Sequence, residues 1–123
     1  MTKILVIEDN PIVLDTLSRV LQTGGYEVVV AKDGVDGLAA FRLEQPDLVV
    51  SDMIMPGQEG TETIRYILAE EPDAKIVAIS GGGRIGNIDF LDLAKKMGAT
   101  AVLAKPFDPD DLLAIVANCL KTG

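Results

Sequence analysis

The chain has 123 residues, of which 48% are hydrophobic and 24% are charged, and this is the ordinary composition of one globular domain with a sizeable core. Its formal net charge of -8 argues against direct binding to nucleic acid, which needs clustered lysine and arginine. Its one cysteine, Cys119, excludes an internal disulfide and favours a cytoplasmic setting, and its lack of histidine excludes both an imidazole base and a phosphohistidine within the chain.

The first predicted unit is a buried strand followed by an amphipathic helix. Residues 4–7 form a continuous apolar run, which predicts a strand and is too short for a signal peptide or a membrane span. Asn10 followed by Pro11 is typical of a helix start, and Gly24-Gly25 predicts the helix end. The predicted inward face of this helix consists of Val13, Leu14, Leu17, Val20 and Leu21.

The second and third units repeat this order. A strand at 26–31 precedes a helix that is capped by Asp33. The predicted inward face of that helix consists of Val35, Leu38, Ala39 and Leu43. Pro46 opens a third strand, which ends at Asp52, and a third helix at 60–71 is ended by a proline.

The last two units complete five repeats of strand and helix. The predicted elements are a strand at 75–80, a flexible glycine-rich loop at 81–86, a helix that begins at Asn87 or Asp89, a strand at 101–104 and a helix that is capped by Asp108. No linker or low-complexity tract interrupts them, so we expect residues 1–123 to form a single domain, either as a stand-alone protein or within a longer regulator.

Five strand–helix units with continuous apolar strands predict an α/β fold with a parallel sheet that is covered on both faces. Right-handed crossovers leave few topologies, and the flavodoxin-like doubly wound fold with strand order 2-1-3-4-5 is a common one of this size. The topological switch point of this fold, where the strand order reverses, lies between the first and third strands. Ligands of such sheets bind at the carboxyl ends of the strands beside this point.

Three acids follow these two strands: Glu8 and Asp9 come after the first, and Asp52 ends the third. Each acid taken singly has an ordinary structural explanation, because acids are common before helix N-termini and in turns. Together at one sheet edge, however, the three carboxylates would repel one another without a cation. Mg²⁺ fits best, since it prefers carboxylate oxygens together with water and phosphate.

Two further polar residues follow the fourth and fifth strands. Ser80 could be a turn hydroxyl, and Lys105, which precedes Pro106, could be an exposed lysine at a strand end. At the same sheet edge as the acids, the hydroxyl could donate to a phosphoryl oxygen and the ammonium group could neutralise its charge.

Four motifs at these strand ends resemble those of one known family. They are Ile-Glu-Asp-Asn at 7–10, Ser-Asp-Met-Ile-Met-Pro-Gly at 51–57, Ala-Ile-Ser at 78–80 and Ala-Lys-Pro-Phe at 104–107. In this order and spacing, the chain resembles the receiver domain of two-component response regulators over residues 4–120. Each motif is weak alone, and the specificity lies in the combination of four.

The resemblance implies a role for each site residue. Asp52 would be the phosphoacceptor, and Ser80 and Lys105 would contact the phosphoryl group. Mg²⁺ would bind to Asp9, Asp52 and the carbonyl of Ile54, with Glu8 acting through water. The Lys105–Pro106 bond is typically cis in this family.

The resemblance also implies partners for a signalling domain that turns over no metabolite. A histidine kinase or histidine phosphotransfer protein would donate the phosphoryl group. The domain would catalyse its own aspartyl phosphorylation, and it could also catalyse hydrolysis of the aspartyl phosphate. A downstream protein would bind the surface of the fourth helix, fifth strand and fifth helix, without a nucleic acid or a membrane as direct partner.

The chain departs from the family at three positions. Val102 stands where relatives carry Tyr or Phe, so the usual switch that couples the Ser80 hydroxyl to an aromatic ring is incomplete. We therefore expect the switch to act by ordering residues 81–86 and the start of the fourth helix. Ile54 and Gly82 occupy positions that influence the lifetime of the phosphate in this family. Ile54 would shield the phosphate and Gly82 would open the site to water, so the two residues predict opposite effects on that lifetime.

Two other functions fit the sequence less well. An interaction module that signals without phosphate would not need the acids, Ser80 and Lys105. A flavin or nucleotide domain would rely on residues 81–86, which lack the Gly-Lys-Ser/Thr ending of a Walker loop. An acidic switch point would also repel a phosphate-bearing cofactor in the absence of metal.

Overall fold

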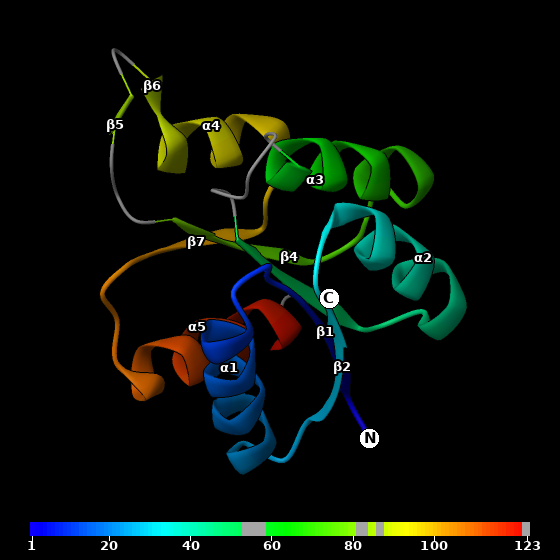
Figure 1. Cartoon of the computed structure of the whole chain (residues 1–123), viewed down its shortest axis with the longest axis vertical. Helices are drawn as coiled ribbons and strands as arrows, with labels where there is room; N and C mark the ends of the chain where they lie inside the picture. The colour runs from blue at the N-terminus through cyan, green and yellow to red at the C-terminus, as the bar shows by residue number, and fades with distance from the viewer. Residues whose placement is uncertain (53–58, 81–83, 86–87, 122–123) are drawn as a thin grey trace.

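The computed structural model describes residues 1–52, 59–80, 84–85 and 88–121. Its elements are β1 (Lys3–Ile7), α1 (Pro11–Thr23), β2 (Glu27–Ala31), α2 (Gly34–Glu44), β3 (Leu48–Asp52), α3 (Glu59–Glu70), β4 (Ile76–Ser80), β5 (Arg84–Ile85), β6 (Ile88–Asp89), α4 (Phe90–Met97), β7 (Ala101–Ala104) and α5 (Pro109–Lys121). Figure 1 shows a central sheet with α2, α3 and α4 on one face and α1 and α5 on the other.

The central sheet has five parallel strands in the order β2-β1-β3-β4-β7. This confirms the predicted flavodoxin-like order 2-1-3-4-5, with β7 as the fifth strand of the sheet. In the register of the sheet, Ile7 lies opposite Ser51 and Ser80 lies opposite Ala104. The carboxyl ends of β1, β3, β4 and β7 therefore meet at one edge of the sheet.

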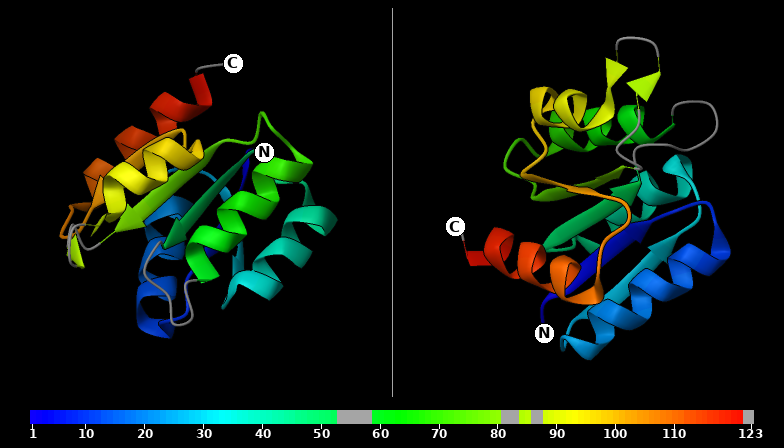
Figure 2. Two further views of the ribbon diagram at one scale, coloured as in Figure 1. Left: turned by 90° about the horizontal axis from the view of Figure 1, so that it is seen from above. Right: turned by 90° about the vertical axis from the view of Figure 1, so that its left-hand side faces the viewer.

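Two separate apolar layers hold the helices to the sheet. On one face, sheet residues such as Leu5, Ile7 and Val49 pack with Ile64 and Ile67 of α3. On the other face, the core consists chiefly of Ile4, Val6, Val50, Val77, Leu17, Leu21, Leu112 and Val116. Because successive strand residues point to opposite faces, a sheet that is covered on both sides needs apolar residues at every strand position. Figure 2 shows both helical layers from two further sides.

Two predicted helix caps are confirmed. The Asn10 side chain accepts hydrogen bonds from the backbone N–H groups of Ile12 and Val13, at 2.9 and 3.2 Å. The Asp33 side chain accepts one from the Asp36 N–H at 2.8 Å. These caps start α1 and α2 where the local sequence predicts them, because each satisfies N–H groups that a helix start leaves unpaired.

The predicted inward face of α2 is wrong at three positions. Val35, Ala39 and Leu43 are exposed, and the buried residues of α2 are Gly34, Gly37 and Phe41, with Leu38 partly buried. Gly37 explains the difference, because a Cβ atom there would lie 2.6 Å from Cδ1 of Ile7. The helix approaches β1 through glycine, and a pattern of large apolar residues cannot reveal such a contact.

The prediction of a plain loop at 81–86 is wrong at 84–85. Arg84–Ile85 pairs with Ile88–Asp89 in a short antiparallel ribbon, and α4 begins at Phe90, directly after one of the two predicted starts. In the sequence, Gly86-Asn87 stands between the two paired segments, and this dipeptide is typical of hairpin turns. Residues 81–83 and 86–87 themselves lie outside the described residues.

Membrane insertion of a helix has no support in the part of the chain that the structure describes. None of its helices combines the length and the apolar character that a membrane span requires.

Candidate functional site

The carboxyl edge of the sheet brings most of the predicted site residues together. Asp52 is the last residue of β3, and Ser80 is the last residue of β4. Glu8 directly follows β1, and Lys105 directly follows β7. The Lys105 backbone N–H donates to the Ser80 carbonyl at 2.7 Å, which ties the ends of β4 and β7 together.

An ion pair lies at the centre of this edge. The Lys105 Nζ donates to Oδ2 of Asp52 at 3.0 Å. The Asp52 side chain is 6% exposed and the Lys105 side chain is 34% exposed. A carboxylate that is so well buried requires a charged or hydrogen-bonding partner, and Lys105 provides one. The sequence predicts that both residues lie at this edge, but the direct contact between them is seen only in the structure.

Glu8 is a second buried carboxyl group beside Asp52. The pKa of Glu8 is raised to about 8, chiefly by burial and secondly by the neighbouring Asp52 carboxyl group, while the charge of Lys105 opposes the shift. Its Oε1 accepts a long hydrogen bond from the Asn10 N–H at 3.4 Å. Within the described residues, nothing hydrogen-bonds to its buried Oε2. Two adjacent buried carboxyl groups with an unpaired oxygen are suited to a hard cation.

The remaining predicted metal ligands are less closely placed. Asp9 is exposed beside Glu8, and Ile54 lies outside the described residues. Over the residues that the structure describes, no three acidic side chains come close enough to hold a metal ion. The structure therefore brings together Glu8 and Asp52, and the roles of Asp9 and Ile54 stay predictions.

Ser80 and Val102 lie at the β4–β7 side of the site. Ser80 is fully buried. Val102 lies opposite Ala78 and is half-buried, and it packs against the core layer between the sheet and the helices α2 and α3. The residue that the sequence singled out as a departure is therefore a packed aliphatic side chain in β7. The Lys105–Pro106 bond is cis, as predicted.

Comparisons with known proteins agree on one family. The family model described as the response regulator receiver domain matches residues 4–117. Protein PilH of Pseudomonas aeruginosa is 32% identical over 123 residues, which cover both chains completely. Chemotaxis protein CheY of Treponema pallidum is 34% identical over 122 residues, which cover 97% of this chain and 83% of the relative.

Solved structures give the same result. A response regulator receiver domain protein from Clostridium thermocellum superposes with a TM-score of 0.88 at 31% identity, over 98% of this chain and 94% of that one. A CheY-like receiver domain protein from Methanospirillum hungatei has a TM-score of 0.87 at 29% identity, with the same coverage.

Proposed function

Because the chain belongs to the response regulator receiver domain family, whose members are signalling domains of two-component systems, we propose that Asp52 is its phosphoacceptor. The contact of 3.0 Å between Lys105 Nζ and Asp52 Oδ2 supports this most directly. It places a cation against a buried carboxylate at the switch point of the sheet, where ligands of this fold bind. Residues 1–123 then act as one receiver domain.

The proposed transfer is a displacement at phosphorus. A carboxylate oxygen of Asp52 attacks the phosphorus of a phosphohistidine on a separate kinase or phosphotransfer protein. The O–P bond forms while the N–P bond breaks, and the electron pair remains on the departing imidazole. Lys105 stabilises negative charge on the transferred group, and the buried position of Asp52 limits access of water to the product.

Mg²⁺ is the proposed cofactor, and Glu8, Asp9, Asp52 and the carbonyl of Ile54 would hold it. The buried Oε2 of Glu8, which accepts no hydrogen bond from any described residue, and the neighbouring Asp52 fit such a cation. When bound, Mg²⁺ would neutralise charge on the phosphoryl oxygens. Binding must displace the proton that burial retains on Glu8, so affinity should rise with pH.

The response to phosphate is proposed to pass through Ser80 and Lys105. Their backbones are joined by the hydrogen bond of 2.7 Å between Lys105 N–H and the Ser80 carbonyl, so a shift of either residue moves the ends of β4 and β7 together. These strand ends adjoin α4 and α5, and we propose that this surface binds the downstream partner. With Val102 in place of an aromatic ring, ordering of residues 81–86 would carry the switch.

The decisive test is labelling of the purified protein with acetyl phosphate and Mg²⁺. Intact-mass measurement should show one added phosphoryl group on the wild type, none on Asp52→Asn and none in EDTA. Equal labelling of the wild type and Asp52→Asn would disprove the assignment. A wild type that stays unlabelled with both acetyl phosphate and phosphorylated donor proteins would favour a receiver that signals without phosphate.

A further inference from the structure

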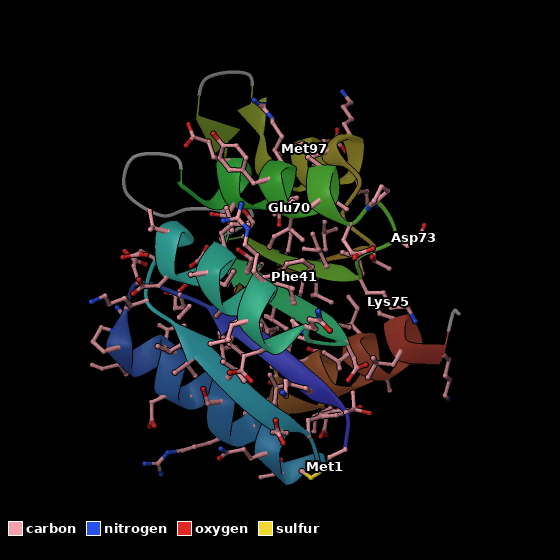
Figure 3. The ribbon with its side chains drawn as sticks, turned by 90° about the vertical axis from the view of Figure 1, so that its right-hand side faces the viewer. Met1, Phe41, Glu70, Asp73, Lys75 and Met97 are labelled. Carbon is pink, nitrogen blue, oxygen red and sulfur yellow. The ribbon has the colours of Figure 1, made fainter. Side chains whose placement is uncertain are left out.

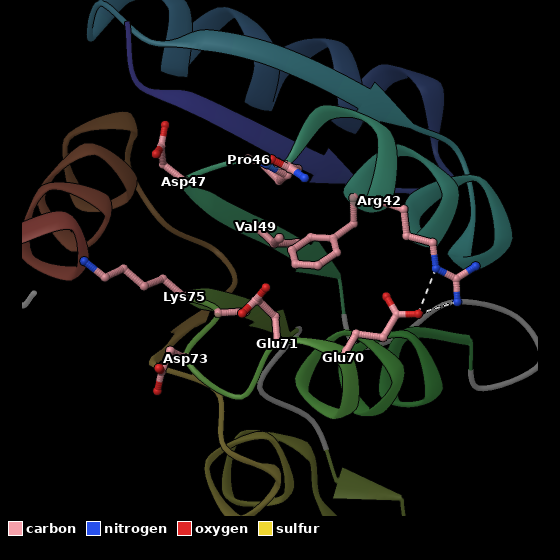
Figure 4. A pocket seen from close by; sticks show the side chains of 11 residues that line it. Arg42, Pro46, Asp47, Val49, Glu70, Glu71, Asp73 and Lys75 are labelled. Atoms are coloured by element: carbon pink, nitrogen blue, oxygen red, sulfur yellow. Dashed lines mark hydrogen bonds and ion pairs between the residues drawn. The ribbon is translucent and has the colours of Figure 1, made fainter.

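The space between α2 and α3 is lined by residues that the phosphoryl chemistry does not use. It contains two hollows of about 510 and 360 Å³, and Arg42 lines both of them. The Arg42 Nε donates to Oε1 of Glu70 at 2.8 Å, so this ion pair joins α2 to α3 at the larger hollow (Figure 4). Together these hollows form what we call the α2–α3 groove, and Figure 3 shows Phe41 and Glu70 on the same side of the molecule.

The walls of the α2–α3 groove are largely apolar. Phe41 and Val49 line the larger hollow, and Leu38, Val35 and Tyr66 line the smaller one. Val35 and Tyr66 are exposed although both are large and hydrophobic. Because α2 packs on β1 through Gly37 while Val35 stays exposed, its apolar surface extends beyond its buried face, and exposed apolar side chains beside a groove are typical of an interaction surface.

The charge around the α2–α3 groove is negative. Its lining contains five carboxylates and two cationic side chains, a formal charge of -3: Asp47, Glu62, Glu70, Glu71 and Asp73 against Arg42 and Lys75. Both cations already have intramolecular partners, since Arg42 binds Glu70 and the Lys75 Nζ donates to the Leu120 carbonyl at 3.3 Å. The uncompensated charge therefore favours a basic partner.

We propose that the α2–α3 groove is a docking site for a basic, apolar peptide segment of a partner protein. The apolar side chains of the segment would pack against Leu38, Tyr66 and Val35, and its lysines or arginines would lie beside Glu71 and Asp73. A second copy of this chain is a poorer occupant, because each copy carries a net charge of -8. None of these lining residues belongs to the phosphoacceptor site, so docking does not require Asp52.

The probe is a fluorescein-labelled synthetic peptide of about 14 residues, or four helical turns. Its leucines are spaced for one helical face and its lysines flank them. Fluorescence anisotropy with the full chain measures its affinity, and a peptide with glutamate in place of lysine is the matched control. Amide shifts in a nitrogen–proton spectrum should map the basic peptide to 34–44 and 62–75 and leave 109–121 unchanged.

Two pairs of variants separate specific docking from general attraction to an acidic protein. Glu71→Lys with Asp73→Lys should weaken binding at least about tenfold, and Asp92→Lys with Asp110→Lys, which reverses the same charge on α4 and α5, should change it less than about twofold. Val35→Ser should weaken binding and Ile12→Ser should not, although both side chains are 77% exposed. Asp52→Asn should bind as the wild type does.

Four results would disprove docking at the α2–α3 groove and would leave the proposed role of Asp52 unaffected. They are an absence of peptide binding, equal binding of the acidic peptide, equal weakening by both charge-reversed pairs, or loss of binding in Asp52→Asn. Sedimentation that shows a dimer sensitive to Val35→Ser would assign the groove to a second copy instead. Conversely, intact peptide docking with an unlabelled Asp52 would leave the groove standing and refute the phosphoacceptor.

Discussion

Two ion pairs of similar length have different surroundings: one lies at the carboxyl edge of the sheet, and the other joins the helices α2 and α3 on one face of it. Lys105 and Asp52 are 3.0 Å apart with side chains 34% and 6% exposed, whereas Arg42 and Glu70 are 2.8 Å apart with side chains 60% and 37% exposed. Beside the first pair, burial raises the pKa of Glu8 to about 8. In the second pair, the hydrogen bond from Arg42 lowers the pKa of Glu70. The pKa of Glu8 and that of Glu70 therefore move in opposite directions, because burial dominates at Glu8 and the hydrogen bond from Arg42 dominates at Glu70.

The pH dependence of stability gives the largest expected effect. Because the folded-state pKa of Glu8 lies above its unfolded value of 4.5, the folded state binds the extra proton and loses stability as pH rises from about 4.5 to about 8. We expect the free energy of unfolding in EDTA to fall by as much as about 4 kcal/mol over this range. Urea unfolding of the wild type and Glu8→Gln measures it, and the variant should lack the slope.

Glu70 supplies the matched control for this slope. Its folded pKa is lowered, so its small contribution is present above the unfolded pKa and is lost as pH falls through the folded pKa. Glu70→Gln should therefore leave the loss of stability between pH 5 and 8 unchanged. A slope that persists in Glu8→Gln would show that another group carries it.

Removal of each cation is the next largest effect. Lys105→Ala leaves the buried Asp52 carboxylate without its ion-pair partner, and we expect a loss of about 2 kcal/mol at pH 8, reduced from that of a fully buried pair because Lys105 is partly exposed. Arg42→Ala, at an exposed pair, should cost much less. Thermal unfolding of both variants measures the difference.

Lys105→Ala should also uncouple phosphorylation from the response more than it prevents labelling. We expect retained labelling of Asp52 and reduced amide shifts at 84–97 with a beryllofluoride phosphate mimic. Shifts as large as in the wild type would contradict the proposed role of Lys105.

Metal binding should give a smaller stabilisation, confined to the carboxyl edge. A weakly bound ion that selects the folded state adds about 1 kcal/mol at concentrations several times its dissociation constant. Melting with and without Mg²⁺ should therefore show a rise in the wild type that Asp9→Ala largely loses and Asp73→Ala keeps. A full Mg²⁺ response in Asp9→Ala would exclude Asp9 as a ligand.

The smallest expected effect is a local change in hydrogen exchange. Beryllofluoride should slow amide exchange across residues 81–88 and leave the amides of α2 unchanged, because the added acceptors lie at the Ser80 end of β4. Equal exchange with and without the mimic would favour a displacement of α4 without ordering of this segment.

Local patterns explain which parts of the fold could be predicted. Apolar runs and the caps at Asn10 and Asp33 depend on neighbouring residues, so they correctly located the five strands of the sheet and the starts of α1 and α2. The outward face of α2 could not be predicted, because the close approach of Gly37 to Ile7 involves residues 30 positions apart in the printed sequence. The β5–β6 ribbon had a signal in Gly86-Asn87, but three consecutive glycines before it favoured a loop.

The sequence by itself determined that the strands of a parallel sheet end in Glu8, Asp52, Ser80 and Lys105, because strand length and polarity are local properties. Only the tertiary structure decided which of these groups touch. The register of the strands sets Lys105 against Asp52 and buries Glu8 beside them, while Asp9, one residue further on, is exposed to solvent. Contact and burial arise between strands that are distant in the chain, and the raised pKa of Glu8 arises only from them.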